Sequence, residues 1–317
     1  MKTQILILFA LISLTMFSCQ NFSGVDNSLS TSTDDVVLKS AEIASNDILI
    51  ESISDELGYE AEFMATSERL LRQLAKFHRG KQLMEGHKGS RYVEGYSPEI
   101  TIDTADTGYP VTITIDYGDS TLLKNGRVIT GLVTIEISAA RDTDGATRTI
   151  TYSNCVIDSV SVDGMASEVF NGDNETARTI TSNSTITFVL PDGTVIDRTG
   201  NHVRNWVAGL ATPLEHDDDV IETTGTTQAS TSTGNVWARE ILEPLVRMGD
   251  CRHHVSGIVQ FSQNGTVLAT LNYGNGECDD LAVLTVDGED VEIELGGCKP
   301  EPNMNDHQKK EKRNGKH

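Results

Sequence analysis

Apolar and polar residues alternate with a period of two through most of the chain from Glu99 onward. Such alternation, in runs rich in valine, isoleucine and threonine, is typical of strands with one buried face. It predicts a mainly β domain over residues 99–298. The clearest runs are VTITIDY, VTIEIS, TRTITY, VIDSVSV, STITFVL, HVSGIVQF, TVLATLNY and DVEIEL.

Turn-forming dipeptides separate these runs at short intervals. Asn-Gly and Asp-Gly accept the positive φ angles of tight hairpin turns, so they predict antiparallel neighbours. We therefore expect an antiparallel meander, which the pattern allows to be a sandwich, an open barrel or a long curved sheet. The dipeptides are Asn125-Gly126, Asp163-Gly164, Asp192-Gly193, Asn264-Gly265 and Asp287-Gly288.

Residues 34–85 have a different period and predict a short α-helical segment in front of the β domain. Apolar residues recur there at intervals of three and four, in two stretches. Helices of this size can pack on a sheet or act as a spacer above a membrane. The two apolar stripes are Val37, Ala41, Ala44 and Ile48, and then Leu70, Leu71, Leu74 and Phe77.

One phrase occurs twice in the β region, first as TITIDYGDS and then as ATLNYGNGE. Each copy is an alternating run that ends in Tyr-Gly and a polar turn, which Asp119 or Asn275 can close as an Asx-type turn. The simplest interpretation is two related hairpin modules, at about 111–138 and 266–295; chance similarity of two hairpins is the alternative. The shared turn positions are Tyr117, Gly118 and Asp119, and Tyr273, Gly274 and Asn275.

The N-terminus has the features of a bacterial lipoprotein signal. Residues 1–18 hold one lysine and an apolar run too short to span a membrane, and Cys19 follows directly. This arrangement resembles a loose lipobox, in which the cysteine is acylated; an ordinary cleaved signal is the alternative. The polar residues 19–33 predict a flexible tether, and Gln20 favours the outer membrane. The expected partner of Cys19 is therefore a membrane, through a lipid anchor.

The formal net charge of −22 over 317 residues narrows the possible partners. A body this acidic repels phosphate backbones, so we expect no nucleic-acid partner. The lysine-rich residues 299–317 contain few apolar side chains and predict a disordered charged tail. A hydrophobic content of 38% is enough for a packed core.

Four cysteines remain once Cys19 is set aside, and an even number in an exported chain predicts disulfides. Four cysteines allow three pairings, which the sequence does not decide between. Cys251 and Cys278 flank one expected hairpin and form the candidate pair. No two cysteines have the spacing of a zinc site. The other two are Cys155 and Cys298.

No motif predicts a catalytic residue, a cofactor or a metal. The chain lacks G-x-S-x-G. His253 and His254 are adjacent and would face opposite sides of a strand, which makes a shared metal unfavourable. The run Asp217–Asp219 lacks the spacing of a calcium loop and indicates an acidic surface loop. Trp206 and Trp237 are expected in the core, with one of them facing a ligand as the alternative.

A set of longer phrases carries a family resemblance over residues 99–296. These phrases resemble a family of Bacteroidota outer-membrane or surface lipoproteins with repeated Tyr-Gly hairpin modules. The resemblance implies export and a lipid anchor, but it brings no activity, ligand or catalytic residue. Leu122 departs from it, because a cysteine is expected there, and this leaves Cys155 without an obvious partner. The phrases are TITIDYGDS, LLKNGRVITGLVTIEI, RTITYSNCVIDSVSVDG, VRNWVAG, PLVRMGDCRHHVSGIVQF and LNYGNGECDDLAVLTVDGE.

These observations predict a lipid-anchored protein of the outer membrane that acts as a non-enzymatic binding or structural module. The sequence leaves open whether it faces the cell surface or the periplasm. Its expected partner is an envelope protein or a glycan. The alternative is a glycan- or peptide-directed hydrolase with an acidic loop site on the β domain.

Overall fold

The computed structural model describes one long helix and the strands that follow it. The predicted second helical stripe, Cys19, the tether, Cys298 and the charged tail lie outside the described residues. The described residues are 33–68, 92–93, 95–105, 108–140, 143–173, 175–212, 215, 217–249, 251 and 253–295.

The strands form a 14-stranded antiparallel sheet that follows the order of the chain, except that β2 pairs with β4 and the short β3 pairs only with β4 beside the main path. The predicted mainly β meander is confirmed, and it is a long curved sheet. The strands are β1 (Glu99–Thr104), β2 (Val111–Asp116), β3 (Thr121–Leu122), β4 (Val128–Ile137), β5 (Thr147–Ile157), β6 (Val160–Gly172), β7 (Arg178–Val189), β8 (Val195–Ala208), β9 (Val220–Thr231), β10 (Val236–Met248), β11 (Ser256–Gln263), β12 (Thr266–Asn275), β13 (Leu281–Val286) and β14 (Glu289–Glu294).

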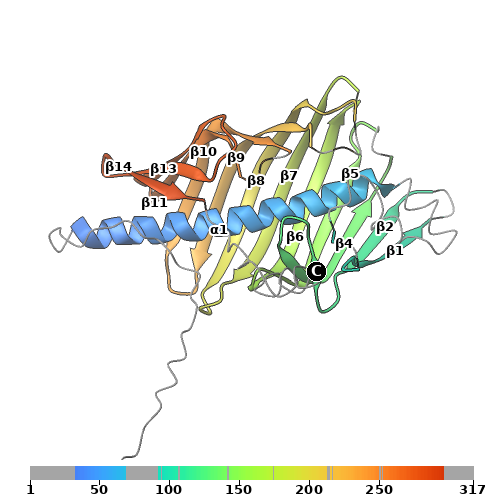
Figure 1. Cartoon of the computed structure of the whole chain (residues 1–317), viewed down its shortest axis with the longest axis horizontal. Helices are drawn as coiled ribbons and strands as arrows, with labels where there is room; N and C mark the ends of the chain where they lie inside the picture. The colour runs from blue at the N-terminus through green and yellow to red at the C-terminus, as the bar shows by residue number, and fades with distance from the viewer. Residues whose placement is uncertain are drawn as a thin grey trace, which may run out of the picture.

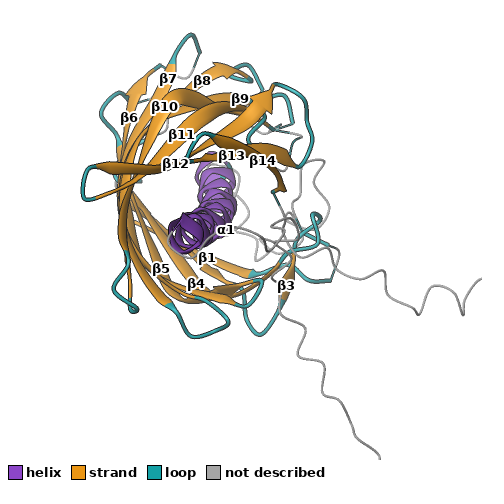
Figure 2. Cartoon of the chain, turned by 90° about the vertical axis from the view of Figure 1, so that its left-hand side faces the viewer, coloured by secondary structure: helices purple, strands orange, loops and turns teal. Residues whose placement is uncertain are grey.

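A single helix, α1 (Thr33–Thr66), lies along the concave side of this sheet. Figure 1 shows it crossing the strands, with its N-terminal end on the side of β11–β14 and its C-terminal end near β5. In Figure 2 the sheet curls around the helix like an open trough. The pattern of residues predicts the helix and the sheet separately, and the structure shows that one encloses the other.

The enclosure explains why the helix buries residues on several sides. Ile43, Ile50, Ile53 and Leu57 join a core cluster with the inward residues of β2, β4, β5 and β10–β14, and Ile48 packs against that cluster. Trp237 belongs to the same core and Trp206 to a second, smaller cluster on β6–β9 and just before β5, so the predicted core role of both tryptophans is confirmed.

Four of the five predicted turn dipeptides lie between consecutive strands, and the fifth does not. Asp163-Gly164 lies inside β6, and the turn between β5 and β6 is formed by Asp158 and Ser159, both with positive φ. The predicted strand VIDSVSV is thus divided between β5 and β6. Gly164 has a different role, because a Cβ there would lie 2.4 Å from the carbonyl oxygen of Thr185 on β7.

Candidate functional site

A stripe of carboxylates follows one side of α1. Asp47, Glu51, Asp55 and Glu62 are spaced by four, four and seven residues, which places them on one side of an α-helix. Asp47 and Glu51 are buried and Glu62 is 4% exposed. Ionised carboxylates are almost never buried unless they are paired, so this side of the helix requires matching cations.

The sheet supplies those cations as arginines. Every arginine within the described residues lies on the concave side of the sheet or at its rim, and most pair directly with α1. Arg204 instead pairs with Glu168 of β6. We call this set the arginine wall; its members are Arg127, Arg148, Arg178, Arg198, Arg204, Arg239 and Arg247.

The N-terminal half of the stripe meets β8 and β10. Arg239 Nε lies 3.1 Å from Asp47 Oδ2, and its Nη2 lies 3.5 Å from Glu51 Oε1; Arg198 pairs with the same glutamate. Burial opposes ionisation of Glu51, but the two guanidiniums outweigh it and hold its pKa below the usual range. Burial raises the pKa of Asp47, and Trp237 Nε1 lies 3.4 Å from its Oδ1.

The C-terminal half of the stripe meets β5 and β7 through one glutamate. Glu62 Oε2 accepts a hydrogen bond from Arg148 Nη1 at 3.0 Å, and its Oε1 pairs with Arg178. Arg148 also donates to Glu168 at 2.6 Å through Nε. Burial opposes ionisation of Glu62, yet Arg178 and Arg148 keep its pKa low. Within this cluster, cations and carboxylates alternate so that each charge faces an opposite one.

Two aromatic rings lie next to the guanidinium group of Arg178. Its guanidinium carbon lies 4.3 Å from the ring centre of Trp206 and 5.3 Å from that of Phe170. Cation–π contacts of this kind are strongest where water is excluded. The arginine is therefore held by two rings as well as by Glu62.

Each copy of the Tyr-Gly phrase places a buried tyrosine on the concave side of the sheet. Tyr117 Oη donates to Glu60 of α1 at 3.1 Å, and Tyr273 packs edge-on against His254 at 5.3 Å between ring centres. Gly118 and Gly274 have the positive φ expected of them. Their amides donate to Asp116 Oδ1 and Asn272 Oδ1, so the Asx acceptor stands before the tyrosine. The prediction had placed it after, at Asp119 or Asn275.

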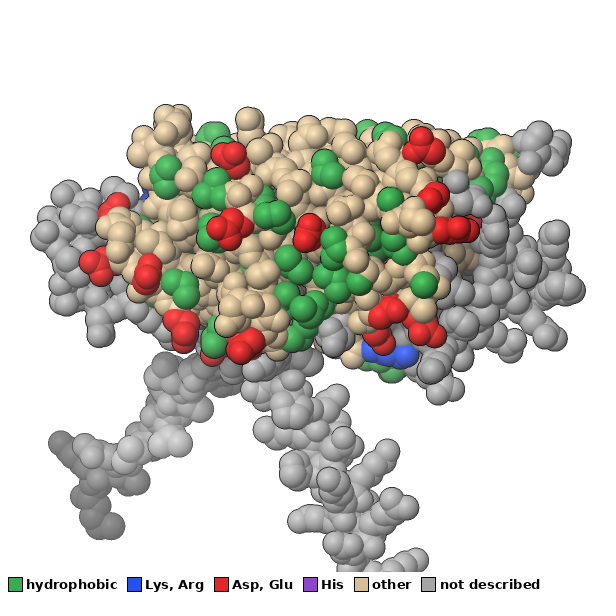
Figure 3. Space-filling view, turned by 90° about the horizontal axis from the view of Figure 1, so that it is seen from above, with side chains coloured by type: hydrophobic (Ala, Val, Ile, Leu, Met, Phe, Trp, Pro, Cys, Tyr) green, Lys and Arg blue, Asp and Glu red, His purple; other side chains and the backbone are tan. Residues whose placement is uncertain are grey.

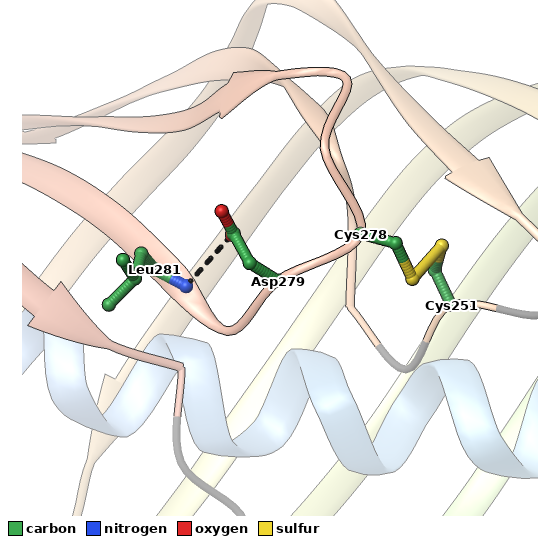
Figure 4. Close-up of a disulfide and its surroundings, with 4 residues drawn as sticks. All are labelled: Cys251, Cys278, Asp279 and Leu281. Atoms are coloured by element: carbon green, nitrogen blue, oxygen red, sulfur yellow. Dashed lines mark hydrogen bonds between the residues drawn. A yellow bond between two sulfur atoms is a disulfide. The ribbon is translucent and has the colours of Figure 1, made fainter.

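The predicted pair Cys251 and Cys278 forms a disulfide, and Figure 4 shows it beside the start of β13. It joins the segment between β10 and β11 to the segment between β12 and β13. Next to it, the amide of Leu281 donates to Asp279 Oδ1 at 3.1 Å. Cys155 is a free thiol buried on β5, and burial raises its pKa to about 11.

The remaining sequence candidates lie in the segments that precede β9 and β11. His253 and His254 lie just before β11 and are both buried, and His254 Nε2 is 3.7 Å from Asp55 Oδ2. In the loop before β9, Asp218 accepts a hydrogen bond from Thr212 at 2.5 Å, and Asp219 is buried. Among the described residues, no group of three or more metal-ligating side chains lies close enough to hold a metal ion.

The outer face of the sheet differs from its interior. Figure 3 shows one side of it, where scattered acidic and hydrophobic side chains are seen and lysine or arginine is scarce. Of the described basic residues, Lys124 is the exposed one, since Lys39 is half-buried and the arginines line the trough. The described outer surface is therefore acidic or neutral, while positive charge is concentrated around α1.

Comparison with known proteins gives no assignment. No family model, no curated protein and no solved structure matches the chain. No described helix is long and apolar enough to cross a membrane. The interpretation of the site therefore depends on its own geometry.

The motifs of the sequence do not identify the arginine wall, although the strand pattern contains a signal for it. Arg148 and Arg178 each stand two residues before an inward isoleucine, and Arg239 lies between Trp237 and Ile241. Because side chains two apart share a face of a strand, these arginines lie on the same face of the sheet as the core residues. Arginine is rarely buried without a partner, so its presence there indicates a buried acidic element.

Proposed function

We propose that this protein is a membrane-anchored lipoprotein that acts as a non-enzymatic binding or structural module at the bacterial cell envelope. The observation that carries the proposal is the occupation of the trough by α1. A curved sheet offers its concave side to a ligand, but here the chain's own helix fills that side and pairs its carboxylates with arginines. The outer face of the sheet remains as the broad surface for a partner.

The electrostatics of the interior support binding over catalysis. A carboxylate that acts as an acid or base is favoured by a raised pKa in an accessible cleft. The stripe residues Glu51 and Glu62 have the opposite property, because arginines hold their pKa low. Asp47 has a raised pKa, but it is enclosed between Arg239 and Trp237. These groups stabilise the fold and are not presented to a substrate.

The anchor is tested by growing cells with labelled palmitate and comparing the natural chain with Cys19→Ala. We expect label on the natural chain and none on the variant, and we expect external protease to cleave the natural protein on intact cells. Label that persists in Cys19→Ala would contradict acylation at this residue. Protection from protease on intact cells, with cleavage after lysis, would place the protein inside the envelope and contradict surface exposure.

A further inference from the structure

The outer face of strands β5–β9 contains a patch without charge. Strand register aligns three outward residues from each of these five strands into three transverse rows. We call this patch the neutral grid. Its rows are Thr147, Val169, Thr181, Val203 and Thr224; Thr149, Ser167, Asn183, Asn201 and Thr226; and Thr151, Met165, Thr185, Thr199 and Gln228.

The composition of the grid is unusual for this chain. Charged residues make up 23% of the sequence, yet the grid has none. Twelve of its positions carry hydroxyl or carboxamide groups and three carry valine or methionine. Strand preference alone accounts for threonine, but it does not account for the exclusion of acids, which are frequent elsewhere on the outer face.

Acids surround the grid on its four sides. The middle row continues into Glu136 on β4 and Glu240 on β10. Asp163 and Asp197 lie in the next row at one end, and Glu222 lies beyond the other end. With strands about 4.8 Å apart and alternate residues about 6.8 Å apart, the uncharged area measures roughly 19 by 14 Å.

We propose that the neutral grid binds a neutral glycan chain. Its hydroxyl and carboxamide groups both donate and accept hydrogen bonds, as the hydroxyls of a sugar do. Val169, Val203 and Met165 offer apolar surface to the C–H faces of the sugar rings. The surrounding carboxylates repel anionic polymers and lipid headgroups. Protein partners favour aromatic residues and arginine at a contact surface, and the grid has neither. The inference rests on the outer face being the binding surface, as proposed above.

The test uses the full-length protein in a non-ionic detergent, run through native gels that contain dextran, mannan or the anionic polymer alginate. We expect dextran or mannan to slow migration and alginate to have no effect. Asn201→Asp keeps the shape of the side chain, removes its N–H donors and adds a negative charge in the middle row of the grid. It should raise the dissociation constant for the neutral polymer about tenfold, which corresponds to a loss of roughly 1.4 kcal/mol of binding free energy.

Asn205→Asp is the matched control. Asn205 lies on β8 like Asn201, faces outward and is exposed, but it stands outside the grid. It should leave binding within about twofold of the natural chain, because it adds the same charge to the border row that already holds Glu222 and removes no donor from the grid. Equal loss in both variants, binding of alginate alone, or no retardation by dextran and mannan would each overturn the proposal.

The anchor experiment separates this inference from the proposed function. If palmitate label depends on Cys19 and protease reaches the protein, while dextran and mannan fail to bind, the glycan inference alone is wrong. If the polymers bind through the grid but no label is found, the binding surface stands and the anchor is wrong. The palmitate and protease measurements do not depend on the result of the native gels.

Discussion

Arg239 of β10 and Asp47 of α1, which lie 192 positions apart in the chain, form an ion pair of 3.1 Å in which both side chains are almost fully buried. Removing one partner of such a pair is far more costly than replacing both, because a lone buried charge remains. The arginine wall is therefore a condition for placing α1 inside the sheet.

Replacing Arg239 tests this condition. We expect Arg239→Met to lower the free energy of unfolding by about 3–5 kcal/mol, because it leaves Asp47 and Glu51 facing each other without their shared cation. Lys124→Met makes the same chemical change at an exposed position and should cost less than about 0.5 kcal/mol. Urea titration followed by tryptophan fluorescence measures both, since Trp237 lies against Asp47. Similar losses in the two variants would contradict a structural role for the pair.

As the pH falls, protonation linked to His202 should destabilise the fold before the carboxylates of the protein are protonated. His202 lies on β8 near Glu51, Arg198, Arg204 and Arg239, and burial lowers its pKa to about 4. The unfolded chain takes up a proton near pH 6.5 and the folded chain does not. Stability is thus complete above pH 6.5 and falls as the pH drops towards 4, by up to about 1.4 kcal/mol per pH unit.

His202→Gln should remove the contribution of His202 to the pH dependence of stability and leave the contributions of the other groups. His254, whose pKa is also lowered by burial, contributes in the same direction, and the raised pKa of Asp47 acts in the opposite one. Both groups are present in the natural chain and in the variant, so the difference between the two isolates His202. Urea midpoints at pH 7.5, 6.0 and 5.0 measure it. Parallel curves for the two proteins would mean that His202 takes up its proton as readily in the folded chain as in the unfolded one.

The same interior explains which strands the sequence predicts well. Strands β2, β4 and β5 carry mostly apolar residues at their inward positions, and the alternation identifies them. Between the inward Ile196 and Trp206, strand β8 carries Arg198, Gly200, His202 and Arg204 at its inward positions, so its pattern has no continuous apolar face. These residues are inward because α1 presents carboxylates there, and that contact between distant segments is not visible in the local pattern. Strand β8 is accordingly absent from the predicted runs.

In the candidate site too, local features can be predicted from the sequence and contacts between distant segments cannot. The disulfide between Cys251 and Cys278 was predictable because a local feature, the hairpin between the two residues, brings them together. The neutral grid and the arginine wall depend on register across five or more strands, and register follows from the bulges and turns. One misplaced turn, as at Asp163-Gly164, moves every row beyond it.

Loss of the disulfide should destabilise the region of β10–β13. The bond closes a loop with a sequence separation of 27 residues, for which the chain-entropy relation gives about 3–4 kcal/mol. We expect Cys251→Ser with Cys278→Ser to lower the free energy of unfolding by an amount of this order, and dithiothreitol to have a similar effect on the natural chain. No change in urea midpoint upon reduction would show that the bond is absent in the exported protein.

Cys155 should remain unreactive in the folded protein. Its Sγ lies 3.2 Å from the carbonyl oxygen of Leu132 on β4, and burial raises its pKa to about 11, so thiolate is scarce at pH 8. We expect iodoacetamide at pH 8 to leave Cys155 unmodified until urea is added, with peptide mapping by mass spectrometry as the measurement. Exposed side chains on the same strand, such as Thr147, lie on the other face, so Thr147→Cys is the positive control. Rapid modification of Cys155 without urea, at the rate of that control, would mean that the sheet opens between β4 and β5 under native conditions.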